Sequence, residues 1–573
     1  MQRWSDRLAL AALLALGLAY HLCLIGEGIG LIDEGHLANA ARRLAGGEIL
    51  YRDVYTVYPP ASFHVAAWLF ELFGTSLFVT RGLHLAMTLL LAALVYVAGR
   101  SWMPAPFAFL AGALVAATGW SVVAEGSHYA CLYGAIPMAA LIVLGRADRR
   151  AEGEARAGAA SRSEPATGLA SDSSLGPGPA TDARPLAPGA LVSVGALAGL
   201  ALAFRLEPFV GLALAGGVVV LVRAGLGVDA VRQLAWLVVG TLLVAVPIGV
   251  FYAVHGALGE LFRAVFWTSF GQYLQGGEFN LPMPPIEGWP EDASRRALRR
   301  MFISWEFRLP VLLYAGAIAE LLLAGWRSRA RRATPGATAW PARIPTGTLQ
   351  RAALALFGSV LYLRATGRSD YYHLAPILFP AYLLGADALA RIWSRWVPPR
   401  RLALAWPLVV VLLASSLFVH EFDRPLRHAI ASARGETDAV PVVPGGPRLE
   451  RAHQLDDLVR DVRARTREGE PILVLPWYPI VYFLAERPNP TRFDWLFPGY
   501  LKTEAEVAAY LDAIDRSAVR VVVYSPISID DRDDRSLAAF APEIDRFLRR
   551  RFEPVKRYGR FWILVRRSAD ADA

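Results

Sequence analysis

The chain has 573 residues, of which 55% are hydrophobic and only 19% are charged. This composition is too apolar for a soluble protein of such length, and its long uncharged stretches indicate a protein that crosses a membrane many times. The formal net charge of +9 comes almost wholly from arginines between these stretches, so it reports membrane topology and argues against nucleic-acid binding. The two cysteines, Cys23 and Cys131, form no metal or redox motif.

Apolar stretches of spanning length recur along the first 420 residues. A helix needs about 20 apolar residues to cross the hydrocarbon of a bilayer, and about eleven stretches approach that length. The first lacks a small-residue cleavage site, so we expect a retained helix and not a signal peptide. The expected spans lie near residues 8–27, 76–98, 104–122, 129–145, 189–204, 207–223, 233–254, 309–326, 350–364, 371–393 and 402–420.

Arginines gather at the N-terminus and in the segments 146–188, 327–332 and 391–401. When the expected spans are threaded in order, all of these segments fall on one side of the membrane, which the positive-inside rule assigns to the cytoplasm. The loops at about 28–75 and 255–308, together with the C-terminus, then lie on the outer face.

The first outer loop contains two stretches that read as short helices. Residues 34–45 repeat apolar side chains at helical spacing and stop at a pair of glycines. Residues 61–73 follow Pro60 and are rich in aromatics, but they are too short to span, so we expect a helix in the plane of the membrane. The stretch 49–58 between them reads as a strand.

The composition changes after about residue 420. We therefore divide the chain into a membrane domain at 1–420, a Pro/Gly-rich linker at 421–450 and a soluble domain at 451–573. Alternating strand and helix patterns in the soluble domain predict an α/β fold with a mainly parallel sheet. Strands are expected at 471–476, 519–524 and 561–565, and helices near 450–467, 503–516 and 537–551. No glycine-rich phosphate loop follows any of these strands.

Two adjacent acids, Asp33 and Glu34, open the first outer loop and are the candidate catalytic residues. Two structural alternatives stand beside this hypothesis. Asp33 could cap the helix that starts at Glu34, and Glu34 could be a solvated acid of the first helical turn. Arg52 and Tyr58, in the same loop, are candidates for substrate binding, whereas Arg42 and Arg43 fit a solvent-exposed helix face.

Further candidates lie at the outer ends of distant spans. Arg205 and Glu207 form a tight turn between two apolar stretches, where ionisable residues indicate either a functional site or a pair that snorkels to the interface. Before the tenth expected span, arginine, acid, tyrosine and histidine crowd together, as in an anion site or an aromatic belt. The candidates there are Arg368, Asp370, Tyr372 and His373, and Tyr273 lies in a long outer loop suited to a sugar or a lipid.

Several of these stretches resemble the C-type membrane glycosyltransferases of family 39, the branch of the protein O-mannosyltransferases and lipid A aminoarabinose transferases. They are DEGHLANAARRLAGGEILYRDVYTVYPP at 33–60, FRLEPF at 204–209 and YYHLAPILFP at 371–380. The resemblance implies a polytopic α-helical membrane protein with in-plane helices and a C-terminal α/β domain. The chain lacks the lumenal sugar-binding module of the protein O-mannosyltransferases, which weighs against a protein acceptor.

The resemblance also implies a reaction. A polyprenyl-phosphate sugar would be the donor, and a hydroxyl group of a glycan, a lipid or a protein would be the acceptor. The reaction would take place at the outer face of a bacterial inner membrane, whose lipids would surround the enzyme. Asp33 would act as the base, and Arg205, Arg368 and His373 would stabilise the departing phosphate in an inverting displacement. No cofactor is required, although Asp33 and Glu34 could hold a divalent cation with substrate oxygens.

Two other functions are compatible with the same residues. In a transporter or flippase of lipid-linked sugars, the acids and arginines would gate the passage of the substrate. Broken helices or internal repeats would favour this function. A non-catalytic protein of an envelope-assembly complex would use the outer domain for binding. An assay of labelled-sugar transfer, with membranes that contain the wild type or the Asp33→Asn variant, separates an enzyme from these two alternatives.

Overall fold

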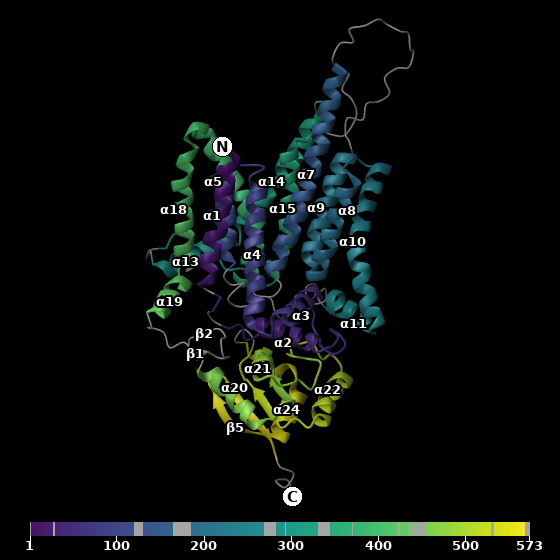
Figure 1. Cartoon of the computed structure of the whole chain (residues 1–573), viewed down its shortest axis with the longest axis vertical. Coiled ribbons are helices and arrows are strands. Elements are labelled where there is room, and N and C mark those ends of the chain that lie inside the picture. Colours follow the sequence, from purple (N-terminus) through teal and green to yellow (C-terminus); the bar gives the residue numbers. More distant parts are fainter. Residues whose placement is uncertain are drawn as a thin grey trace.

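The computed structural model shows a long helical bundle with a small α/β domain packed on one end (Figure 1). The amino terminus and the far end of the bundle lie opposite that domain. The structure describes residues 2–23, 25–26, 29–119, 130–163, 185–268, 282–290, 292, 294–330, 344–369, 371–420, 424–434, 440–441, 448–449, 453–528 and 532–567.

The bundle is built from apolar helices that run between its two ends (Figure 1). They are α1 (Gln2–Leu22), α4 (Leu77–Gly99), α5 (Ala105–Thr118), α7 (Ala130–Ser163), α8 (Pro188–Phe204), α9 (Leu206–Ala224), α10 (Val228–Val254), α14 (Leu309–Ala330), α15 (Thr346–Gly367), α17 (Phe379–Trp396) and α18 (Ala405–Val419). Shorter elements join them: α11 (Leu258–Phe262), a π-helix (Arg263–Thr268), α13 (Arg295–Glu306), α16 (Tyr371–Leu374) and the 3-10 turns Ala375–Ile377 and Pro399–Leu404.

Each stretch expected to span overlaps one of these helices, and the arrangement confirms a polytopic helical membrane protein. Within the described residues, 6 helices are both long and apolar enough to cross a membrane by length and composition. The expected span at 371–393 is wrong in its first half. Pro376 cannot donate a backbone N–H, so the chain forms a short helix and a 3-10 turn before α17 begins at Phe379.

The loop after α1 folds over the end of the bundle as two helices, α2 (Asp33–Ala45) and α3 (Ala61–Phe73). Both expected helices are confirmed. The expected strand at 49–58 is wrong, because this stretch is a tight turn held by one isolated bridge between Leu50 and Val54. Tyr51 adopts a positive φ of 69° there, which a strand residue does not.

The C-terminal domain contains a four-stranded sheet in the order β3-β4-β6-β5. Only β3 and β4 pair in parallel, so the expected mainly parallel sheet is in fact mixed. Its strands are β3 (Ile472–Leu475), β4 (Val521–Tyr524), β5 (Phe552–Tyr558) and β6 (Phe561–Arg566). Its helices are α20 (His453–Arg465), α21 (Ile480–Ala485), α22 (Glu504–Arg516), α23 (Leu537–Phe540) and α24 (Pro542–Arg551), with a 3-10 turn at Asp533–Arg535.

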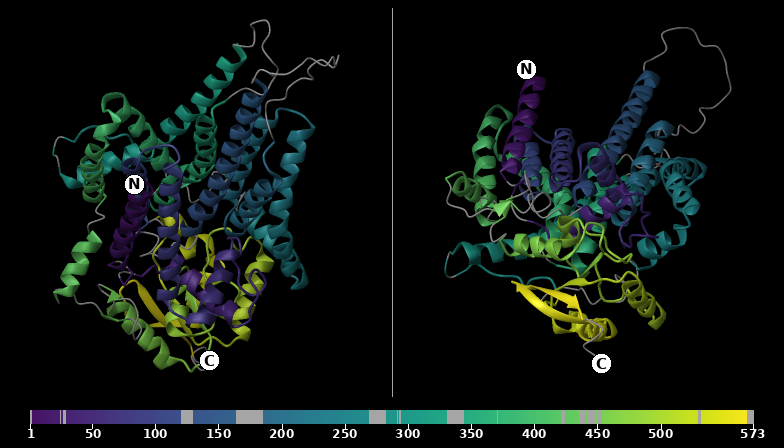
Figure 2. Two further views of the ribbon diagram at one scale, coloured as in Figure 1. Left: turned by 45° about the horizontal axis from the view of Figure 1, so that its top comes forward. Right: turned by 60° about the horizontal axis from the view of Figure 1, so that its bottom comes forward.

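The connection between the bundle and this domain contains a helix, α19 (Arg424–Ala433), and a short antiparallel pair, β1 (Val440–Pro441) and β2 (Arg448–Leu449). The domain then packs directly under α2 and α3, as both rotated views also show (Figure 2). One buried apolar cluster runs without interruption from α2 and α3 into α21 and β3. The C-terminal domain therefore shares a core with α2 and α3.

Candidate active site

Asp33 lies at the seam between the bundle and the C-terminal domain. It is the first residue of α2 and its side chain is partly exposed. Ile32, not Asp33, occupies the N-cap, and no side chain caps the helix. The capping alternative is therefore not what the structure shows. A carboxylate at the first helical position is instead favoured by the partial positive charge of the helix start.

Glu34, the next residue, is held in a buried ion pair with Arg81 of α4. Arg81 Nε donates to Glu34 Oε1 at 2.6 Å, and Arg81 Nη2 donates to Oε2 at 2.8 Å. Oε2 also accepts from the backbone N–H of Gly30 at 2.8 Å. Both side chains are at most 1% exposed. Glu34 is therefore not a solvated acid. Its contacts fix the turn that carries Asp33 against the bundle.

Aromatic side chains from both domains form a wall beside these acids. The ring of His36 stacks on Trp495 of the C-terminal domain with a centroid distance of 4.0 Å, and it meets the edge of Phe63. Tyr58 lies 6.5 Å from both His36 and Trp495. Burial raises the pKa of Tyr500 well above its usual value, and Tyr55, Tyr58 and Asp33 add to the shift. Tyr500 therefore lies within electrostatic reach of Asp33.

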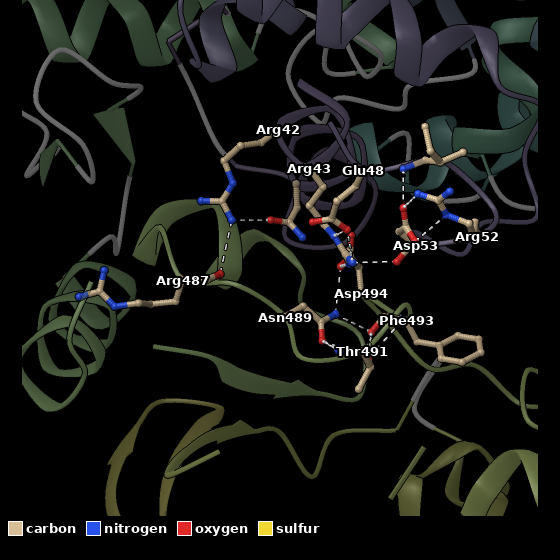
Figure 3. A network of polar contacts seen from close by, with 12 residues as sticks. Arg42, Arg43, Glu48, Arg52, Asp53, Arg487, Asn489, Thr491, Phe493 and Asp494 are labelled. Atoms are coloured by element: carbon tan, nitrogen blue, oxygen red, sulfur yellow. Dashed lines mark hydrogen bonds and ion pairs between the residues drawn. The ribbon is translucent and has the colours of Figure 1, made fainter. Parts of the chain in front are cut away.

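Charged side chains lock the C-terminal domain onto α2 (Figure 3). Arg43 pairs with Asp494 at 2.6 Å and with Glu48 at 2.6 Å, and only 10% of its side chain is exposed. Arg42 contacts the backbone oxygen of Arg487 at 3.4 Å. The expectation that Arg42 and Arg43 form a solvent-exposed face is wrong, because a domain that is distant in sequence covers that face.

Gly35 shows how closely the two parts approach. A Cβ atom at this position would lie 2.4 Å from the backbone nitrogen of Ile480 at the start of α21. A contact below 3 Å requires backbone movement, so only glycine fits here without a shift.

His36 is expected to make the stability of this interface depend on pH. Burial lowers the pKa of His36 to about 4, opposed by Asp494 and assisted by Arg43. A depressed pKa means that the folded state prefers neutral histidine, so its stabilisation is complete above the unfolded pKa near 6.5 and is lost as the pH falls toward 4. We expect this residue to remove about 2 kcal/mol from the free energy of unfolding between pH 7 and pH 5.

Equilibrium denaturation at several pH values measures this effect. The His36→Leu variant removes the titrating group, so its free energy of unfolding should fall less steeply than that of the wild type across the same range. Identical slopes for the two proteins would contradict the assignment to His36.

A cluster of charges lies at the ends of α8, α9 and α15. Arg205 joins α8 to α9 in an extended conformation, and its guanidinium carbon lies 5.0 Å from the centre of the Tyr58 ring. Glu207 contacts Arg205 at 3.2 Å and Arg364 of α15 at 3.3 Å. The acid therefore bridges two mostly buried arginines. This cluster is fixed within the bundle, and through Tyr58 it reaches the aromatic wall.

The structure describes only some of the other predicted site residues, and not all of these lie near the aromatic wall. Arg368 caps the end of α15 one turn beyond Arg364, and His373 lies in α16; both are partly exposed. Arg52 is half exposed and pairs with its neighbour Asp53 at 2.8 Å, outside the aromatic wall. Tyr273, Asp370 and the side chain of Tyr372 lie outside what the structure describes.

Several residues of the site are not among the candidates that the sequence predicts. They are Arg81, Arg364, Trp495 and Tyr500, which are separated widely along the chain, and the last two belong to the C-terminal domain. Arg81 does leave a signal in the sequence, because an arginine in the first turns of an expected span requires a partner. Glu34 is engaged by Arg81 through both of its carboxylate oxygens. Among the described residues, no group of three metal-binding side chains converges.

No family model matches the sequence, and neither does any curated protein. Similar solved structures, however, extend over most of the chain. ArnT from Cupriavidus metallidurans bound to undecaprenyl phosphate has a TM-score of 0.53 at 18% identity, with 98% of each chain covered. The apo state of the same protein has a TM-score of 0.51 at 16% identity, with 97% of each chain covered.

A second kind of protein shares the arrangement. The oligosaccharyltransferase AglB from Archaeoglobus fulgidus, in complex with an inhibitory peptide and a dolichol-phosphate, has a TM-score of 0.50 at 11% identity. It covers 91% of this chain, and 70% of its own length is matched. The chain has the C-type membrane glycosyltransferase fold. Within that C-type fold, the shared region with ArnT extends through both the bundle and the C-terminal domain.

Proposed function

We propose that the protein is an integral-membrane glycosyltransferase that moves a hexosyl or pentosyl group from a polyprenyl-phosphate carrier to a hydroxyl acceptor. The acceptor oxygen attacks the anomeric carbon while the bond between that carbon and the phosphate oxygen breaks. Asp33 takes the proton of the attacking hydroxyl, a role that contributes typically about 10²–10⁴-fold in rate. A single displacement of this kind inverts the anomeric centre.

The observation that carries the proposal is the position of Asp33. Its partly exposed carboxylate stands at the seam of the two domains, next to an aromatic wall and at the same end of the bundle as Arg205. Aromatic faces suit the apolar faces of sugar rings, and arginines suit phosphate oxygens. The fold that the chain shares with ArnT, whose structure holds undecaprenyl phosphate, adds support for a lipid-phosphate donor.

The leaving group requires cations rather than an acid, because a lipid phosphate departs as an anion. Arg205, Arg368 and His373 are the groups that we assign to it, with Arg364 added on the evidence of its contact with Glu207. Glu207 holds the two arginines in place and offsets part of their positive charge. Asp33 is also the residue that would bind a divalent cation together with substrate oxygens, should the reaction use one.

We place this chemistry at the outer face of a bacterial inner membrane, with the amino terminus in the cytoplasm. The described parts of the arginine-rich segments, residues 146–163, 327–330 and 391–401, support this orientation, since they lie at the end of the bundle away from the C-terminal domain. The acceptor is then a glycan, a lipid or a protein of the cell envelope.

Arg205 should contribute to donor binding. Arg205→Ala is expected to weaken the binding of a polyprenyl phosphate by roughly 1.5–3 kcal/mol, the size of a hydrogen bond to a charged group, or about 10- to 150-fold in dissociation constant. Arg400→Ala, an exposed arginine at the opposite end of the bundle, is the matched control. Equal affinities for the two variants would refute the phosphate role.

The proposed function is tested by transfer itself. Membranes that contain the protein should move label from a polyprenyl-phosphate sugar into a product that no longer extracts with the carrier lipid. If the label instead crosses the bilayer while it stays on its carrier, the protein is a transporter.

A further inference from the structure

A cavity of about 260 Å³ lies at the end of the bundle opposite the C-terminal domain. Its walls come from α4, α7, α9, α15 and the turn after α4. The volume far exceeds the 10–15 Å³ or so that one water molecule needs. None of the residues assigned to the glycosyltransferase site lines it.

The rim of the cavity is positively charged. Arg100, Arg146 and Arg149 line it against a single acid, Asp148, which gives a formal lining charge of 3 − 1 = +2. Asp148 is bound to Arg223 at 2.5 Å and Arg100 to Asp6 at 2.9 Å, so these charges are already neutralised. The net charge therefore resides on Arg146 and Arg149.

These two arginines lie one turn apart on α7, so their side chains leave the same face of the helix. Burial lowers the pKa of Arg149, and the neighbouring charge of Arg146 lowers it further, against the effect of Asp148. Two like charges held side by side repel each other, and an anion between them would relieve that repulsion.

Hydrogen bonds fix the rim before any ligand arrives. The amide oxygen of Gln350 accepts from Arg149 Nη1 at 3.0 Å and from the indole N–H of Trp102 at 2.7 Å. The amide nitrogen of Gln350 donates to the backbone oxygen of Gly145 at 2.7 Å. One glutamine on α15 thus ties together α7 and the turn after α4. A rim that is held in this way loses little conformational entropy on binding.

Deeper in the cavity the lining is apolar, with Met138, Leu141, Val219 and Leu354 among its residues. A cationic rim above apolar walls, at an end of a membrane bundle, matches an amphiphile with an anionic head. We propose that this cavity binds one anionic phospholipid, with its phosphate at Arg146 and Arg149 and its glycerol and upper chain against the apolar walls. Inorganic phosphate would use the rim but gain nothing from those walls.

Native mass spectrometry of the purified full chain with added phosphatidylglycerol tests the proposal. We expect one lipid per protein, bound more tightly than phosphatidylcholine, and not displaced by equal concentrations of inorganic phosphate. Each arginine near a membrane surface strengthens the binding of an anionic lipid about fivefold. The double variant Arg146→Gln with Arg149→Gln should therefore raise the dissociation constant of phosphatidylglycerol about thirtyfold. Leu141→Trp, which fills the cavity and keeps its charge, should also weaken binding.

The matched control is Arg395→Gln with Arg400→Gln, which removes two exposed arginines from the same end of the bundle but outside the cavity. An equal loss in the control and the cavity variant would show general attraction to the charged surface and overturn the proposal. Competition by inorganic phosphate as effective as that of the lipid, or no effect of Leu141→Trp, would overturn it as well.

Discussion

Asp33→Asn should leave the fold intact and lower sugar transfer by about 10²–10⁴-fold, the usual cost of losing a general base. An amide keeps the size of the carboxylate and one acceptor oxygen, but its NH₂ group donates instead of accepting, so it cannot take the proton of the acceptor. Because we assign the carrier phosphate to arginines and a histidine elsewhere in the site, donor binding should change little and the loss should fall on kcat. Transfer from a labelled polyprenyl-phosphate sugar, together with donor binding to the purified protein, separates the two quantities.

Asp512→Asn provides the matched control for that experiment. Asp512 is an exposed acid of α22 that pairs with Arg516 and that we do not assign to the site, so its loss should not affect transfer. If Asp33→Asn retained activity near that of the control, the base would have to lie elsewhere. Glu34 could not readily replace it, because both of its oxygens are bound to Arg81 or Gly30.

The second large effect concerns stability. Glu34→Ala should destabilise the protein by about 3–5 kcal/mol, because it leaves the guanidinium of Arg81 buried without its counter-charge. The double variant Glu34→Met with Arg81→Met should be less destabilised than Glu34→Ala, since neither charge then remains in the apolar surroundings. Chemical denaturation of the purified wild type, Glu34→Ala and the double variant gives the three free energies of unfolding.

Arg52→Ala is the control for this pair. Arg52 also contacts an acid, Asp53, but its side chain is 50% exposed, so its removal should cost no more than about 1 kcal/mol. If Glu34→Ala cost as little as Arg52→Ala, the buried pair would not be what holds the first turn of α2 against α4.

The helices of this fold were predictable because membrane and surface helices leave direct marks in the sequence. The helix α2 follows from apolar side chains at helical spacing that end at two glycines, and α3 follows from Pro60 and its aromatic run. The strand β5 was missed because Phe552–Tyr558 is largely exposed and charged, without the apolar alternation of a buried strand. Because β5 was missed, the sheet was expected to be mainly parallel. In the structure, β5 and β6 form an antiparallel hairpin, and the sheet is mixed.

The site was predictable only in its local parts. Asp33 and Glu34 stand out as acids beside an apolar segment, and Arg205 stands out as a charge between two spans. Apart from Arg81, the residues that complete the site do not stand out, because each depends on contacts between distant segments. Arg43 and Asp494 are 451 residues apart, and Trp495 lies in a stretch that reads as ordinary domain core. No local pattern reveals that the C-terminal domain completes the wall beside Asp33.

We propose that this protein transfers a sugar to the cell envelope and that Asp33 acts as the base in this transfer. Mass spectrometry of envelope glycans tests it most directly, in cells that lack the protein and in cells that carry the wild type, Asp33→Asn or Asp512→Asn at equal protein levels. We predict that one glycan modification disappears both without the protein and with Asp33→Asn, and that Asp512→Asn retains it. An envelope that is unchanged by Asp33→Asn, although it changes when the protein is absent, would contradict the account.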